Sequence, residues 1–117
     1  MQIKTIAVDF TEGQSIYPKL KKELSPLSIG LLVNNVGMGT FPGRLNDVQS
    51  EDGVRQMINC NVMSMVRLTN MVLPSMRRKG KGLIINIGSL LGIGSTPLAT
   101  TYGATKVGPV LFRQFSE

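Results

Sequence analysis

The chain has 117 residues, which suits one compact domain covering residues 1–117 and is too short for two. Hydrophobic residues make up 42% of it and charged residues 17%, the balance of a folded protein and not of a disordered one. One cysteine and no histidine exclude an internal disulfide and leave a zinc ion without its usual nitrogen and sulfur ligands, so no metal site is predicted.

The net charge of +6 raises the question of an anionic partner. These charges, however, are not gathered into one stripe: Lys19, Lys21 and Lys22 belong to one predicted helix, while Arg77, Arg78, Lys79 and Lys81 lie near the end of another. Cations at the end of a helix complement its dipole, and Gly80 can serve as the helix cap. Since no aromatic residues alternate with these charges, we favour a solvated helix end and predict no nucleic-acid partner.

Membrane insertion is not predicted for this segment. No stretch reaches the roughly 18 continuous apolar residues of a membrane span. The first residues also lack the pattern of a signal peptide, because a polar stretch at 9–12 comes before any long apolar region. The segment therefore reads as soluble.

The first predicted elements are a strand, a helix and a second strand. Residues 3–8 form a short β-prone run, and Ile16, Leu20 and Leu24 mark one apolar face of a helix over 15–24. Residues 29–33 are an unbroken apolar run, which predicts a strand buried on both faces.

The second half of the chain repeats this alternation. Residues from about 51 to 76 predict a long helix that is apolar enough to be buried on most sides. Residues 83–87 predict another strand, and a last helix is expected near Tyr102.

The order β-α-β-α-β-α predicts an α/β fold with a parallel sheet covered by helices, of the doubly wound type. Ligands bind such sheets beyond the carboxyl ends of the strands. We therefore expect functional residues just after the three strands, at Asp9, at the turn 34–37 and at Ser89.

Tyr102 and Lys106 are four residues apart, so on a helix their side chains share a face. A nearby ammonium favours the ionised form of a phenol, which lets the hydroxyl exchange a proton at neutral pH. By itself this pair also fits two residues that merely decorate a helix. Ser89 likewise has two readings: a hydroxyl that faces the ligand crevice, or a serine that forms a turn.

Taken together and in order, these motifs resemble the signature of the short-chain dehydrogenases/reductases. The matching residues are Asn34, Asn35, Val36, Gly37, Asn61, Ser89, Tyr102 and Lys106. The resemblance covers essentially the whole chain. Within the family, the segments around 33–38, 59–64 and 82–89 look most like the branch of 17-beta-hydroxysteroid dehydrogenases and very-long-chain 3-oxoacyl-CoA reductases.

The resemblance implies a partial Rossmann-like fold and an oxidoreductase. Such an enzyme transfers hydride between NADP(H) or NAD(H), with NADP favoured, and a ketone or secondary alcohol of a steroid or fatty-acyl substrate. Tyr102 would then donate or accept the substrate proton, while Ser89 would bind and orient the carbonyl oxygen of the substrate. Lys106 would hold the nicotinamide ribose and stabilise the phenolate, and Asn61 would hold a water of the proton relay.

The resemblance also assigns the rest of the cofactor site. Asp9 would lie beside the adenine ring, although a simple turn or cap is the alternative. Asn34, Asn35, Val36 and Gly37 would pass their backbone along the adenosine ribose, the alternative being a plain turn after a strand. The long helices would serve as core or as the interface of a homodimer.

The chain also departs from the family. No Gly-rich phosphate-binding turn precedes Ile3, and the final strands are absent, so we expect an incomplete segment of the fold. Pro109 inside a helix costs roughly 3 kcal/mol. The alternative hypothesis is therefore a non-catalytic fragment that at most associates with a full-length partner; a basic nucleic-acid-binding module ranks last, because the charges form no single stripe. The branch implies the endoplasmic reticulum if an anchor lies upstream, and otherwise the cytoplasm.

Overall fold

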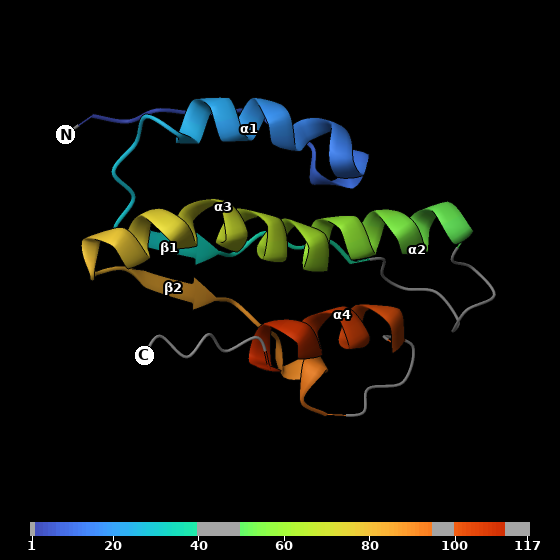
Figure 1. The fold of residues 1–117 in the computed structure, drawn as a ribbon. Coiled ribbons are helices and arrows are strands. Elements are labelled where there is room, and N and C mark those ends of the chain that lie inside the picture. Colours follow the sequence, from blue (N-terminus) through green and yellow to red (C-terminus); the bar gives the residue numbers. More distant parts are fainter. Residues whose placement is uncertain (1, 40–49, 95–99, 112–117) are drawn as a thin grey trace.

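The computed structural model describes residues 2–39, 50–94 and 100–111. The elements in chain order are the 3₁₀ segment η1 (Phe10–Ile16), helix α1 (Tyr17–Leu24), strand β1 (Leu31–Asn34), helix α2 (Glu51–Ile58), the π-helix η2 (Asn59–Met63), helix α3 (Ser64–Lys79), strand β2 (Leu83–Asn86), the 3₁₀ turn η3 (Leu90–Gly92) and helix α4 (Thr100–Leu111). Figure 1 shows the long α2–η2–α3 helix between α1 on one side and α4 on the other.

The sheet consists of β1 and β2, which run parallel with Leu31 opposite Leu83 and Asn34 opposite Asn86. Two parallel strands need a crossover connection, and the long helix supplies it. The α/β class with a parallel sheet is thus confirmed. Both strands point toward the end of the molecule at which α4 lies (Figure 1).

The boundaries of the long helix follow from its end residues. The Ser50 side chain accepts a hydrogen bond from the Gly53 N–H, and Glu51 in the first turn complements the helix dipole. The helix ends at Gly80, whose φ of 63° is the left-handed conformation that glycine adopts without strain. The solvated basic helix end is confirmed, because residues 77–81 are exposed.

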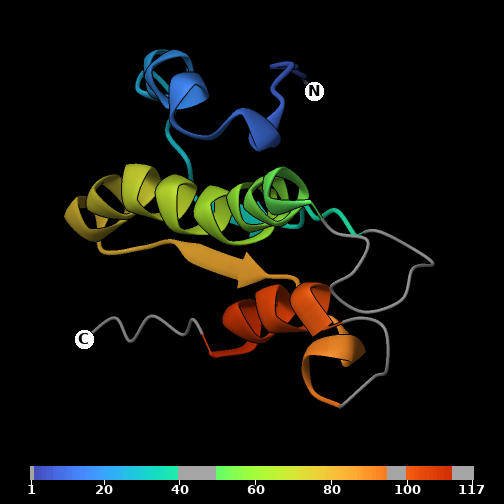
Figure 2. The ribbon, with the colours of Figure 1, turned by 90° about the vertical axis from the view of Figure 1, so that its right-hand side faces the viewer.

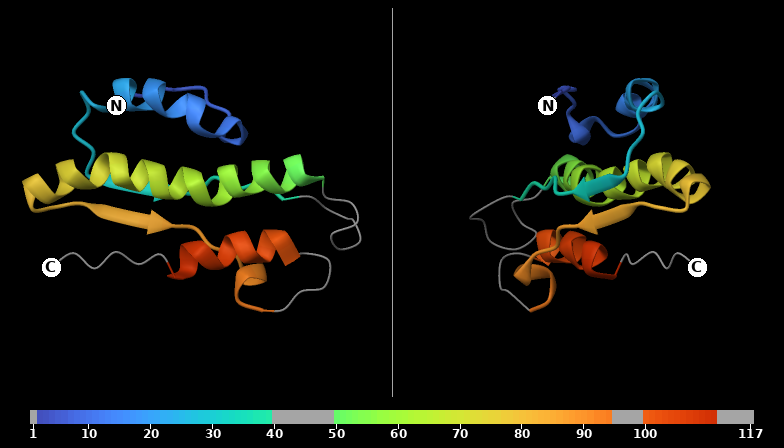
Figure 3. Two further views of the ribbon diagram at one scale, coloured as in Figure 1. Left: turned by 45° about the vertical axis from the view of Figure 1, so that its right-hand side comes forward. Right: turned by 90° about the vertical axis from the view of Figure 1, so that its left-hand side faces the viewer.

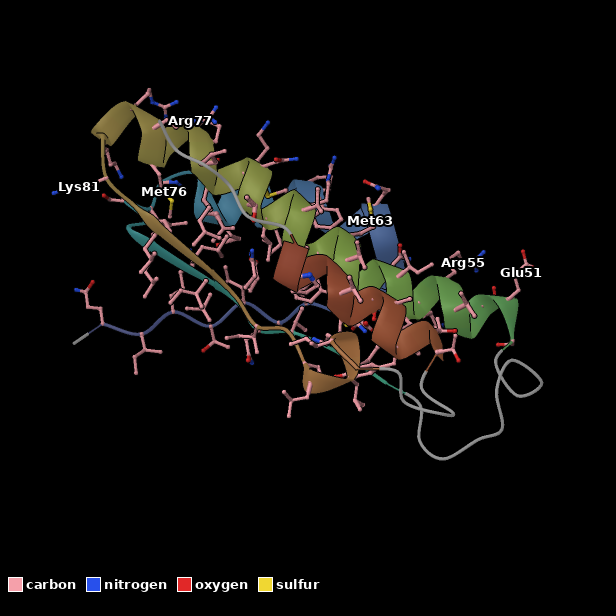
Figure 4. The ribbon with its side chains drawn as sticks, turned by 90° about the horizontal axis from the view of Figure 1, so that it is seen from below. Glu51, Arg55, Met63, Met76, Arg77 and Lys81 are labelled. Atoms are coloured by element: carbon pink, nitrogen blue, oxygen red, sulfur yellow. The ribbon has the colours of Figure 1, made fainter. Side chains whose placement is uncertain are left out.

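One stripe of the long helix is buried, and the prediction that most of its sides are covered is wrong. Ile58 is 43% exposed, because η1, the sheet and α4 cover only the faces turned toward them. The buried stripe contains Met57, Cys60, Asn61, Ser64, Met65, Thr69, Val72 and Met76. Figure 4 shows how the helix runs from Glu51 past Met63 to Arg77, with Met76 beside the chain that enters β2.

The prediction of a strand at residues 3–8 is wrong, because these residues form no regular element. An extended run becomes a strand only where a neighbouring strand pairs with it, and the sheet of the described residues contains β1 and β2 alone. Ile6 and Val8 instead pack against the cluster of Ile16, Tyr17 and Leu20 on the inner side of α1. Figures 2 and 3 show this segment with α1, across the long helix from the sheet.

The sheet is covered on one face in the described part of the chain, so the prediction that residues 29–33 are buried on both faces is wrong. Leu31 is 53% and Val33 48% exposed, and their partners in register, Leu83 and Ile85, are exposed on the same side. The opposite face carries Asn34, which is buried against α3. A strand is buried on both faces only when two layers of helices cover it.

Helix α4 lies beyond the carboxyl ends of the strands, where it contacts η3, η2 and α2. It continues through Pro109, the proline that the sequence placed inside a helix. Proline has no N–H for the carbonyl of Thr105 one turn earlier. Within the described ranges, none of the helices has the length and apolarity to cross a membrane.

Candidate active site

Asn61 lies at the centre of the polar residues beyond the strands. It belongs to the π-helix η2 and is 2% exposed. Its Oδ1 accepts from the Met38 N–H at 2.8 Å, and its Nδ2 donates to the Met38 carbonyl at 2.8 Å. This pair of bonds fixes the loop after β1 against the long helix. Local π-helical turns are rare and are frequent at functional sites.

Helix α4 joins this network through Thr105. Asn61 Nδ2 also donates to Thr105 Oγ1 at 2.8 Å, and that hydroxyl donates to the carbonyl of Tyr102 at 2.7 Å. Thr105 is buried. The side chain of Asn61 and the backbone of Tyr102 are therefore two hydrogen bonds apart.

Tyr102 and Lys106 share one face of α4, as their spacing predicted. Lys106 Nζ is 5.9 Å from the centroid of the Tyr102 ring. A Cβ atom added at Gly37 would lie 2.6 Å from Lys106 Nζ and 3.7 Å from Asn61 Oδ1, and one added at Gly39 would lie 2.9 Å from the Tyr102 ring. The structure thus brings four predicted residues, Gly37, Asn61, Tyr102 and Lys106, to one place.

The ammonium of Lys106 is held in an uncommon environment. The residue is 5% exposed, and within residues 2–39, 50–94 and 100–111 the ion pairs are Lys4 with Glu23 and Asp52 with Arg55. A buried charge is costly unless polar groups satisfy it. Absence of a Cβ at Gly37 lets the ammonium approach the backbone after β1, so polar ligand atoms placed there would find a donor.

Ser89 is half-buried and caps η3, where its Oγ accepts from the Leu91 N–H at 3.2 Å. The strand before it ends at Asn86. The turn that Ser89 begins packs directly on α4: a Cβ at Gly92 would lie 2.6 Å from the backbone carbon of Lys106, and one at Gly103 would lie 2.8 Å from the Leu91 carbonyl oxygen. Ser89 thus sits in a cap, and its segment is fixed against the helix of Tyr102.

The turn after β1 divides into two parts. Asn34 is buried, and its Nδ2 donates to Asn86 Oδ1 at 2.8 Å and to Thr69 Oγ1 at 3.2 Å, so its side chain joins both strands and α3. Its Oδ1 is buried and has no hydrogen-bond partner within the described ranges. Asn35 and Val36 are exposed on the loop that leads to Gly37. The Asn34 side chain is thus part of the framework, while the next residues face outward.

Asp9 is exposed and caps η1, and Thr11 donates to its carboxylate from the backbone N–H at 2.9 Å and from the hydroxyl at 2.7 Å. These hydrogen bonds lower the pKa of Asp9. Burial first, and then the Asp9 charge, raise the pKa of the Cys60 thiol, while Lys106 acts in the opposite direction. Cys60 is a buried free cysteine, and a raised pKa lowers the fraction of its thiol that is present as thiolate.

Sequence reasoning missed five contributors to this site. They are the backbone of Met38, the side chain of Thr105 and the close contacts at Gly39, Gly92 and Gly103. The glycines had a signal in the sequence, because each lies within three residues of a predicted functional residue. Thr105 had only its place between Tyr102 and Lys106, and a backbone group such as that of Met38 leaves no signal in a sequence.

Relatives of known name match nearly the whole chain. It is 46% identical over 116 residues to the very-long-chain 3-oxoacyl-CoA reductase of Macaca fascicularis, with 97% of the chain and 37% of the relative covered. It is 45% identical over 116 residues to the human protein of that name, with the same coverage. The chain thus spans little more than a third of the length of these relatives.

Solved structures agree in fold. The bulky-bulky ketone specific alcohol dehydrogenase of Comamonas testosteroni superposes with a TM-score of 0.80 at 33% identity, covering 90% of this chain and 41% of that one. A short-chain dehydrogenase of Sphingobium yanoikuyae, solved with NADPH, superposes with a TM-score of 0.76 at 31% identity, covering 88% and 40%. The family model of the short chain dehydrogenases matches residues 1–115, and the chain therefore belongs to this family.

Proposed function

We propose that this chain carries the proton-transfer site of an NAD(P)-dependent oxidoreductase that interconverts a ketone and a secondary alcohol. The convergence of Tyr102, Lys106, Asn61 and Gly37 beyond the carboxyl ends of β1 and β2 carries the proposal. A phenol, an ammonium and a buried amide together can deliver a proton and stabilise the charge that remains.

Each residue has a distinct role in this proposal. In the reducing direction the Tyr102 hydroxyl gives its proton to the carbonyl oxygen, and the Lys106 ammonium stabilises the phenolate that is left. Ser89 donates a hydrogen bond to the same oxygen, because its Oγ only accepts in the cap of η3 and its O–H is left to donate. Asn61 holds a water that returns a proton toward Tyr102 through Lys106. When bound, the cofactor supplies the hydride that reaches the carbonyl carbon.

The residues around the turn after β1 fit a nicotinamide cofactor. Lys106 offers an ammonium to the ribose hydroxyls, and the absence of a Cβ at Gly37 lets this ammonium lie against the backbone of the turn. Asn34, Asn35 and Val36 supply backbone groups along the adenosine ribose, and Asp9 lies beside the adenine. NADP is favoured over NAD, which the NADPH complex of the Sphingobium yanoikuyae relative supports.

A fatty-acyl thioester is the favoured substrate, and a steroid ketone is the second candidate. The names of the curated relatives, very-long-chain 3-oxoacyl-CoA reductases, support the first choice. Placement at the endoplasmic reticulum and pairing of two copies through the long helices complete the proposal.

The test uses two proteins: the 117-residue chain itself, and a chimera in which it replaces the matching segment of the human relative. The chimera should consume NADPH when a long-chain 3-oxoacyl-CoA is added, and more slowly with a steroid ketone. Equal or faster turnover of the steroid would reverse the substrate order. If neither protein binds NADPH by calorimetry or reduces any carbonyl, the chain is the non-catalytic fragment and the proposal fails.

A further inference from the structure

We infer that Thr105 is a positioning residue, which holds the helix of Tyr102 in place relative to Asn61. The inference rests on the proposed function, because it concerns the same proton donor. The hydrogen bonds of Thr105 go to the Asn61 side chain and to the Tyr102 carbonyl, and not to the Tyr102 ring or the Lys106 ammonium. Thr105 therefore acts through Asn61 and the backbone of Tyr102.

The hydroxyl of Thr105 uses both its donor and its acceptor capacity. Its oxygen accepts from Asn61 Nδ2 at 2.8 Å, and its hydrogen is donated to the Tyr102 carbonyl at 2.7 Å. Only a hydroxyl side chain of this size can do both. Serine could replace it, whereas the isosteric valine could make neither bond.

Thr105 also completes a connection among three separate segments. Asn61 holds the Met38 backbone through both its side-chain atoms, so the loop after β1 and η2 form one unit. Within the described residues, the hydrogen bond from Asn61 Nδ2 to Thr105 Oγ1 joins this unit to α4. Hydrogen bonds in series in a buried site strengthen one another. Loss of Thr105 would therefore remove the hydrogen bond that sets the position of α4 relative to Asn61, while the packing of α4 on η3 would remain.

A small shift is enough to matter for proton transfer. Misplacement of a reacting group by about 1 Å can cost on the order of a hundredfold in rate. A threonine that bonds back to the carbonyl one turn earlier is common in helices and by itself is only a local contact. The incoming bond from Asn61, 44 residues away in sequence, distinguishes Thr105 from that local case.

The test compares Thr105→Val, Thr105→Ser and the control Thr101→Val in the chimera. Thr101 lies on the same helix, one turn earlier, and is half-buried. We expect Thr105→Val to lower kcat by about tenfold or more while NADPH affinity stays within about twofold. Serine should restore kcat to within about threefold of the unaltered protein, and Thr101→Val should leave it unchanged. A fall in thermal stability with kcat unchanged would mean that Thr105 is structural only and would overturn the inference.

A double-mutant cycle with Asn61→Ala tests the route of the effect. If Thr105 acts through Asn61, then Thr105→Val should add less than about twofold to the loss in kcat caused by Asn61→Ala. Fully multiplicative losses would contradict this route.

A spectroscopic readout separates this inference from the proposed function. In NMR spectra of the chimera, Thr105→Val should shift the Asn61 side-chain amide and the Tyr102 ring signals, and Thr105→Ser should restore both. A chimera without carbonyl reduction whose signals still follow this pattern would refute the proposed function alone. If these signals do not change in the Thr105 variants, the positioning role is refuted, whatever the activity.

Discussion

The predicted site residues fall into two groups that differ in how their polar atoms are satisfied. Tyr102 and Lys106 share one face of α4, and contacts between segments far apart in the sequence bring Asn61 and Gly37 to that helix. Asp9 and Ser89 instead cap the short helical turns that follow them, and both accept from an N–H two residues onward. The first group is assembled by the tertiary structure, whereas the second is satisfied locally.

This difference separates two kinds of support for a functional role. A capping hydrogen bond is enough to account for the presence of Asp9 or Ser89 at its position, because capping side chains are favoured at such turns whatever the protein does. A buried ammonium against a glycine has no such local explanation. The roles proposed for Asp9 and Ser89 therefore rest on the family resemblance, while those of Tyr102 and Lys106 also rest on geometry.

The largest effect is expected at Tyr102. In the chimera, Tyr102→Phe should lower kcat by about a thousandfold, because it removes the proton donor, and NADPH affinity should stay within about twofold. Tyr17→Phe is the matched control, since the Tyr17 hydroxyl is buried with no hydrogen-bond partner in the described ranges. Steady-state kinetics and calorimetry measure both quantities. If Tyr102→Phe keeps turnover within tenfold of the unaltered protein, Tyr102 is not the proton donor.

Lys106 is expected to affect both binding and rate. Lys106→Met should weaken NADPH binding by about tenfold, the scale of one hydrogen bond from a charged group, and should also lower kcat. Lys81→Met, on the exposed stretch after α3, controls for loss of a positive charge. Unchanged cofactor affinity in Lys106→Met would exclude the ribose contact.

Ser89 tests whether a capping residue also has a role in catalysis. Ser89→Ala should lower kcat by about a hundredfold, the scale for removal of one donor to a developing oxyanion. Ser89→Thr keeps a hydroxyl and serves as the comparison. Equal activity of the two variants would leave Ser89 as a cap of η3 and nothing more.

Gly92 tests the packing that holds the Ser89 turn against α4. Alanine there would place its Cβ 2.6 Å from backbone atoms that cannot rotate away. Gly92→Ala should lower the free energy of unfolding by about 1–3 kcal/mol and reduce kcat by roughly tenfold. Gly30→Ala is the control, because no atom lies within 4 Å of its added Cβ. The free energy of unfolding of both variants is measured by denaturant titration. Equal values for Gly92→Ala and Gly30→Ala would contradict the close contact at Gly92.

The smallest effect is expected at Asp9. Hydrogen bonds from Thr11 lower the pKa of Asp9, so its contribution to stability is present above the pKa of the unfolded chain and is lost as pH falls through the lower folded-state value. Thr11→Val should move the pKa of Asp9 upward in an NMR titration. Asp9→Asn should weaken NADPH binding by only about threefold, the scale of a solvent-exposed polar contact. An unaltered affinity would leave Asp9 as a cap alone.

The sequence by itself determined the elements whose signals are local or periodic. The long helix with its cap at Gly80, the two paired strands, and the shared face of Tyr102 and Lys106 all follow from spacing and capping, which act within a few residues. Family motifs then predicted Asn61 as part of the site.

Only the tertiary structure decided which predicted elements find partners. Residues 3–8 have the composition of a strand, yet Ile6 and Val8 pack on α1 because a strand requires a neighbour that composition does not specify. Likewise, Thr105 became part of the site because Asn61 lies against it across 44 residues of sequence. Pairing and convergence depend on the spatial position of distant segments, and local propensity cannot encode that position.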